Sequence, residues 1–160
     1  MSALNAGVGL FIVYGLVYVF IGALTPFMHD TSAGREMLFV SPRTDTTLFG
    51  GRPADLLRAD PHLSQLRSLL LQVIGGLLLS AGVLVIGIAW FGLRAGQSWA
   101  LAILSVAGFV VLPIWIVVLR PYVAAGASPG LADLPPFMWV PAALLLPAIL
   151  FSWLGLRDQP

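Results

Sequence analysis

Four long apolar stretches constrain the fold of this chain more than any other feature of its sequence. Each has about the 20 residues that an α-helix needs to cross the hydrocarbon core of a bilayer. The stretches are Leu4–Leu24, Ser68–Phe91, Trp99–Leu119 and Phe137–Leu154. The chain of 160 residues is 59% hydrophobic and 9% charged, which leaves too few polar side chains to cover a water-soluble domain. The sequence therefore predicts an all-α, multi-pass protein of the cell membrane, in which residues 1–160 form a single four-helix domain embedded in the lipid bilayer.

The charged residues and the missing cysteines argue against several classes of function. Eight arginines and seven acidic residues give a formal net charge of +1, which does not support binding to nucleic acid. The chain has no cysteine, so disulfides and thiolate metal sites are excluded. No Asp, Glu, Arg or His lies well inside a predicted span, whereas ion pumps, proton-coupled carriers and bis-histidine haem proteins need such groups there. We therefore expect no cofactor, and no catalytic, cofactor-binding or metal-binding residue within the spans.

The segment Gly92–Ser98, "GLRAGQS", separates the second and third apolar stretches and is predicted to be a tight turn. Its two glycines permit the turn, and Trp90 and Trp99 flank it where indole rings prefer the membrane interface. Arg94 is then expected to face headgroup phosphates or water as an interfacial anchor, and a ligand-binding role is the alternative.

The longer motif "GLR-x-G-x-x-WA" at residues 92–100 resembles the corresponding turn of small bacterial four-helix membrane proteins of the DoxX-like kind. The resemblance covers this turn and the number of helices. It implies a bacterial four-helix bundle, but no particular activity, because members of this group are largely uncharacterised. Emopamil-binding-like bundles are a broader comparison. Their sterol chemistry uses acidic residues inside the bundle, and this chain places none there, which argues against an isomerase.

Small and weakly polar residues recur at helical spacing and predict the faces along which the helices pack. On the second helix they are Gln72, Gly76, Ser80 and Gly87, and on the first they are Tyr14, Gly15, Tyr18 and Gly22. Close backbone approach at such residues drives helix association in lipid. Tyr18 and Gln72 are expected to lie at a depth at which their side chains could meet. A polar-lined ligand pocket around Tyr18, Gln72 and Ser80 is the alternative to simple packing.

The segment from Thr25 to Arg67 is far longer than the roughly 2–8 residues usual between packed helices. Two β-prone runs, Met37–Val40 and Thr46–Phe49, predict a β-hairpin, and Pro53 is expected to begin a short helix. Asp60 and Pro61 predict the N-cap and first residue of the next helix. Apolar side chains of the hairpin should contact the bundle, the membrane or a partner, and so form a candidate interaction surface. The residues of this surface are Leu38, Val40, Leu48 and Phe49.

Four further residues of this segment form the one conceivable cluster of hard metal ligands. They are His29, Asp30, Asp60 and His62, at the two ends of the loop. Their spacing matches no metal-binding motif, so the alternative to a metal or acid–base site is a solvated surface with Asp60 as a helix cap.

Two functions fit these observations. The first is a non-catalytic accessory subunit or partner-binding component of a larger membrane assembly. The second is a membrane enzyme or carrier for a lipophilic small molecule, a lipid or a quinone-like compound, because binding such a molecule needs no buried charge. The orientation stays open: arginines are concentrated on the side of the long loop, but the same loop carries acidic residues, and the resemblance favours termini inside the cell.

Overall fold

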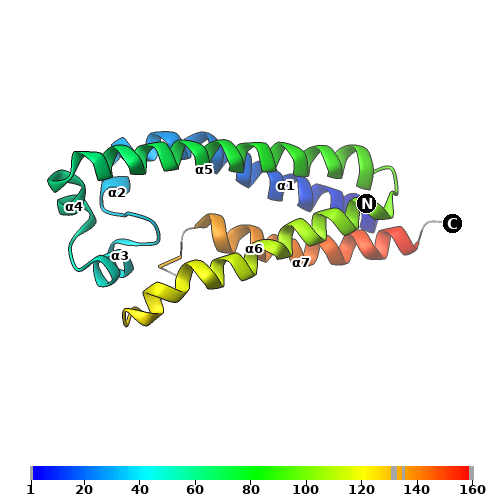
Figure 1. The fold of residues 1–160 in the computed structure, drawn as a ribbon. Coiled ribbons are helices and arrows are strands. Elements are labelled where there is room, and N and C mark those ends of the chain that lie inside the picture. Colours follow the sequence, from blue (N-terminus) through cyan, green and yellow to red (C-terminus); the bar gives the residue numbers. More distant parts are fainter. Residues whose placement is uncertain (1, 131–132, 135, 159–160) are drawn as a thin grey trace.

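Four long helices run roughly along one direction and form the body of the molecule (Figure 1). The computed structural model describes residues 2–130, 133–134 and 136–158, and of residues 29–30 and 136–138 it describes the backbone alone. The long helices are α1 (Ala3–Leu24), α5 (Pro61–Gly87), α6 (Ser98–Ala124) and α7 (Pro136–Arg157). Each contains a stretch that is long and apolar enough to cross a membrane. The described residues contain no strand, which confirms the predicted all-helical class.

The helix α1 lies at the centre and contacts both α5 and α7 along its length. Glycines allow these helices to approach closely. A Cβ atom built on Gly75 of α5 would lie 2.8 Å from the carbonyl oxygen of Gly22, and one on Gly82 would lie 2.6 Å from that of Gly15. On the other side of α1, a Cβ on Gly7 would collide with the backbone of Ser152 in α7. These contacts are the small-residue packing that holds apolar helices together in lipid.

The predicted packing face is confirmed for α1 and wrong for α5. Gln72, Gly76 and Ser80 are all exposed, and a Cβ on Gly76 would meet no atom within 4 Å. The true seam of α5 is Gly75 and Gly82, which share one helix face because they are two turns apart. The small or weakly polar residues at positions 72, 76 and 80 form an equally regular stripe, so spacing alone could not choose between the two faces.

The main hydrophobic core lies toward the end of the bundle that holds the N-terminus, the end of α7 and the turn between α5 and α6 (Figure 1). Phe11, Leu93 and Ala100 are fully buried there. The helix α6 joins this core through its first turns, and Gly108 packs against Leu145 of α7. From residue 109 to residue 121, by contrast, every residue of α6 is exposed or half-buried. A second, smaller core forms near the other end of α6, around Val40, Tyr122 and Ala127.

The turn between α5 and α6 agrees with its sequence signature. A π-helical segment, Ile88–Leu93, extends α5, and Gly96 has the left-handed backbone (φ 76°) that closes the turn. The guanidinium of Arg94 is exposed and lies 4.3 Å from the centre of the Trp90 ring, and Arg157 lies in the same way over Trp153 at 4.5 Å. Arg94 therefore makes a surface cation–π contact.

Replacing Arg94 with Gln is expected to leave the fold intact and to lower the unfolding free energy by less than about 1 kcal/mol, the usual value of an exposed cation–π pair. Thermal unfolding in detergent measures this change, with Arg157→Gln as a matched control. Loss of the folded protein in Arg94→Gln alone would mean that the arginine has a buried partner.

Residues 25–60 form a compact helical cap at the opposite end, and the predicted β-hairpin is wrong. The cap consists of a 3-10 helix (Thr25–Asp30) and three short α-helices, α2 (Ser32–Arg35), α3 (Pro42–Phe49) and α4 (Pro53–Ala59). The hairpin fails because Ser41 accepts a hydrogen bond from the backbone N–H of Thr44 as an N-cap, and Pro42 occupies the first helical position. The predicted helix at Pro53 and the Asp60 N-cap of α5 are both confirmed.

Candidate ligand-binding site

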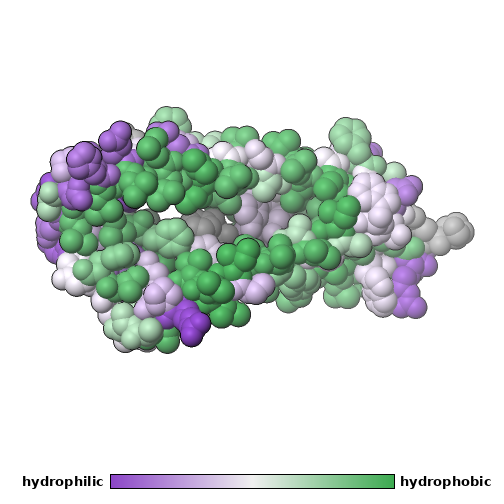
Figure 2. All heavy atoms as spheres, viewed as in Figure 1, coloured by the Kyte–Doolittle hydropathy of each residue, from purple (hydrophilic) through white to green (hydrophobic). Residues whose placement is uncertain are grey.

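Two half-open cavities lie between the long helices, on either side of the Tyr14–Tyr18 pair of α1. The larger, of about 320 Å³, lies between α1, α6 and α7, and the smaller, of about 260 Å³, between α1, α5 and α6. Tyr14, Tyr18, Gly108 and Val111 line both of them. The surface is hollowed between the apolar side chains of α5 and those of α6 (Figure 2). Cavities of roughly this size between the helices of a bundle are common sites for small ligands.

The two tyrosines supply the polar groups of these cavities. Their rings are 5.1 Å apart, and the hydroxyl of Tyr14 donates to that of Tyr18 at 3.5 Å. Tyr14 is buried, whereas Tyr18 is half-buried. A phenol has a single O–H donor, so in this arrangement Tyr18 keeps its own proton for another acceptor. Among the described residues the lining includes no charged side chain, so the cavities suit a neutral molecule with an oxygen acceptor.

Gln72 and Ser80, which the sequence analysis grouped with Tyr18 as a possible polar lining, do not lie beside it in the structure. Gln72 and Ser80 are exposed on α5 and line neither cavity, whereas Tyr18 lines both. The sequence reasoning missed Val111, because its role depends on the distance between α6 and α1.

The expected interaction surface of the loop is largely used within the chain itself. Val40 is 1% exposed and packs against Tyr122 and Ala127, and Leu48 packs on the same cluster. Leu38 lines a cavity beside α1 and α5, while Phe49 stays exposed. Two of the four residues, Val40 and Leu48, thus pack within the chain, and a contact of this surface with a partner stays a prediction.

Asp45 holds the cap together and connects it to α6. Its carboxylate is fully buried and accepts hydrogen bonds from the backbone N–H groups of Leu38 (2.7 Å) and Phe39 (2.9 Å) and from the Tyr122 hydroxyl (2.9 Å). The backbone N–H of Val40 adds a weaker bond at 3.3 Å. Nothing in the local sequence indicated this role, because the partner in α6 lies 77 residues away.

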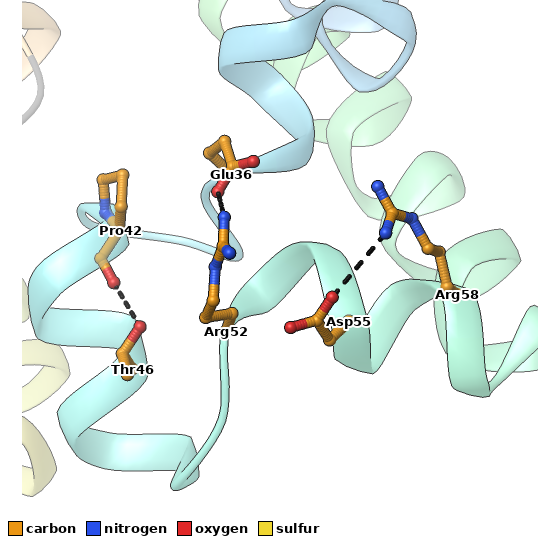
Figure 3. Close-up of polar contacts among 6 residues, drawn as sticks. All are labelled: Glu36, Pro42, Thr46, Arg52, Asp55 and Arg58. Atoms are coloured by element: carbon orange, nitrogen blue, oxygen red, sulfur yellow. Dashed lines mark hydrogen bonds and ion pairs between the residues drawn. The ribbon is translucent and has the colours of Figure 1, made fainter.

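The outer surface of the cap carries exposed polar contacts of a different kind (Figure 3). Arg52 pairs with Glu36 at 3.4 Å, and Arg58 pairs with Asp55 at 3.7 Å. Each side chain of these pairs is at least 44% exposed, so the pairs add little to stability. They give no indication of a binding site.

The expected cluster of hard ligands is described only in part. The side chains of His29 and Asp30 lie outside the described residues. Asp60 accepts hydrogen bonds from the backbone N–H groups of His62 (2.9 Å) and Leu63 (3.3 Å), so its carboxylate caps α5. In the described part of the chain, no three His, Asp or Glu side chains come together as a metal-binding group.

No protein-family model, curated protein or solved structure matches this chain. The resemblance to DoxX-like proteins therefore stays a prediction.

Proposed function

We propose that this chain is a multi-pass protein of the cell membrane that binds a neutral lipophilic molecule inside its helix bundle. The observation that carries the proposal is the pair of cavities that share Tyr14 and Tyr18 as their polar groups. The sequence favoured an accessory subunit over a lipophile-binding protein. We favour lipophile binding over the accessory role, because the two cavities are a specific feature that lipophile binding explains and the accessory role does not.

The chemistry of the cavities indicates the kind of molecule. Apolar walls favour a hydrocarbon body, and the Tyr18 O–H can donate to one carbonyl or ether oxygen. A quinone-like compound or a lipid ester has both features. Passive binding or carriage needs no charged group at the site, and the described lining contains none, so the proposal does not include a chemical step.

Replacing Tyr18 with Phe is expected to weaken binding of such a molecule about five-fold, because one hydrogen bond of about 1 kcal/mol is lost. Val111→Trp should have a larger effect, at least about ten-fold, because its bulk enters both cavities. The probe is a benzoquinone with a decyl side chain, added to the protein in mild detergent. Trp115 and Trp139 line the larger cavity, so quenching of tryptophan fluorescence reports its binding.

Val117→Trp is the matched control, because Val117 lies on the same helix and is 70% exposed. It should bind the probe as the native chain does. Binding of the probe no stronger than to empty detergent micelles, or equal binding by the Val111 and Val117 variants, would contradict the proposal. A stoichiometric membrane protein that copurifies with the native chain, with no small molecule bound, would favour the accessory role instead.

A further inference from the structure

A third cavity, of about 290 Å³, lies outside the tyrosine site, where the cap meets α1 and α5. Its walls are apolar side chains from the end of α1, from the cap segment Met37–Phe39 and from α5, which contributes Leu71, Ile74 and Leu78. Among the described residues of the lining, Arg67 is the only charged one. An apolar cavity with one arginine has a different chemistry from the neutral cavities around Tyr18.

Arg67 is held in an environment that is unusual for an arginine. It is only 8% exposed, and its Nη2 donates a hydrogen bond to the backbone carbonyl of Gly34. Its Nε–H group is buried and has no hydrogen-bond partner. A buried donor without a partner costs about 1–3 kcal/mol, and more on a charged group. Arg67 also lines the cavity, so its guanidinium is the charged group that an anionic oxygen there would meet.

The nearby carboxylate of Asp45 attracts Arg67 electrostatically but does not form an ion pair with it in the described structure. Asp45 already accepts hydrogen bonds from Leu38, Phe39 and Tyr122. Because those donors satisfy the carboxylate, Arg67 can still interact with a ligand.

The shape of the cavity adds a second requirement. Leu78 lies eleven residues after Arg67 on α5, which is about 16 Å along the helix at 1.5 Å per residue. The cavity therefore has a charged end at Arg67 and an apolar wall that follows the helix away from it. Arg67 also directly precedes the apolar stretch Ser68–Phe91, so the charged end coincides with the expected level of lipid headgroups.

From this geometry we infer that the cavity binds an acidic amphiphile, a molecule with a phosphate or carboxylate head at Arg67 and a hydrocarbon chain along Leu71, Ile74 and Leu78. Arginine is suited to this task, because its planar guanidinium binds phosphate and carboxylate oxygens through several N–H groups at once. The inference does not depend on the proposed function, since it concerns a different cavity and a different ligand class. The two sources of such a ligand are an anionic phospholipid of the bilayer and a free fatty acid.

Native mass spectrometry of the full chain in a neutral detergent tests the inference. One arm compares phosphatidylglycerol with phosphatidylcholine of the same acyl chains, and the other compares oleate with oleyl alcohol. The native chain should bind at least one anionic probe about ten-fold better than its neutral counterpart, as expected for hydrogen bonds to a charged group. Preference in the first arm identifies a phospholipid as the ligand, and preference in the second arm identifies a fatty acid.

Variants of the cavity test the contribution of the anionic head of the ligand and that of its hydrocarbon chain separately. Arg67→Gln should abolish the preference for the anionic probe, Arg67→Lys should keep part of it, and Arg52→Gln, whose arginine is exposed on the cap, should keep all of it. Leu71→Trp fills the apolar part of the cavity and should lower binding of the anionic probe while Arg67 is intact. Equal binding of anionic and neutral probes by the native chain would overturn the inference. So would an unchanged preference in folded Arg67→Gln or, if that variant does not fold, unchanged binding of the anionic probe by Leu71→Trp.

Discussion

Gly75→Leu is expected to destabilise the protein by about 3 kcal/mol, the upper range for overpacking a tight contact. A Cβ at this position would lie 2.8 Å from the Gly22 carbonyl oxygen and 2.8 Å from the ring of Pro26. Neither atom belongs to a flexible side chain, so α1 and α5 would have to separate. Unfolding by heat or denaturant in detergent measures the change.

The control lies at the next residue of the same helix. Gly76→Leu places the same side chain where a Cβ meets no atom within 4 Å. It should be neutral, or stabilising by up to about 1 kcal/mol, because leucine favours a helix more than glycine does. Equal destabilisation by the two variants would show that the helices are not packed along Gly75 and Gly82.

Asp45→Ala is expected to cost on the order of 4 kcal/mol in the stability of the cap, because it leaves two strongly bonded backbone N–H groups and the Tyr122 hydroxyl without their acceptor. The effect should be local, since α1 packs against both α5 and α7 elsewhere. Hydrogen exchange of the amides of Leu38 and Phe39 measures it directly, and exchange should become much faster in the variant.

Asp55→Ala is the matched control for this experiment. Asp55 also lies on a cap helix, but its side chain is 61% exposed and its ion pair with Arg58 is at the surface. The expected change is below about 0.5 kcal/mol. Unchanged exchange at Leu38 and Phe39 in Asp45→Ala would mean that the cap is held by its apolar contacts around Val40 and Tyr122 instead.

The long helices could be predicted from the sequence because hydrophobic length alone determines them. The start of α5 was also predictable, since the Asp60–Pro61 pair is a local capping signal whose hydrogen bonds form within three residues. The segment before α3 shows the limit of local reasoning. Its β-prone residues indicate strands, but Ser41 and Pro42 carry an equally local signal for the start of a helix.

The rest depended on contacts between distant parts of the chain. Gly75 and Gly76 are adjacent and chemically identical, so only the orientation of α5 against α1 decides which of them packs. Tyr18 could be named from the sequence as a polar group in an apolar helix, but its cavities depend on where α6 lies. The hydrogen bond from Tyr122 to Asp45 and the burial of Arg67 likewise arise only when the cap folds against the helices.

The way in which α6 is attached has a consequence for how a ligand would reach Tyr18. The helix is fixed by the main core near Ala100 and by Tyr122 at the cap, and residues 109–121 between them include no buried residue. Pro113 lies in this stretch and lacks an N–H, so the helix there has one hydrogen bond fewer to resist bending. Phe109, Leu112 and Ile114 of this stretch line the cavities and are exposed, so the cavities are already open on this side. Bowing of the middle of α6 would widen that opening while both attachments stay intact. A lipophilic guest taking this route would diffuse in laterally from the hydrocarbon phase and would never have to pass through water.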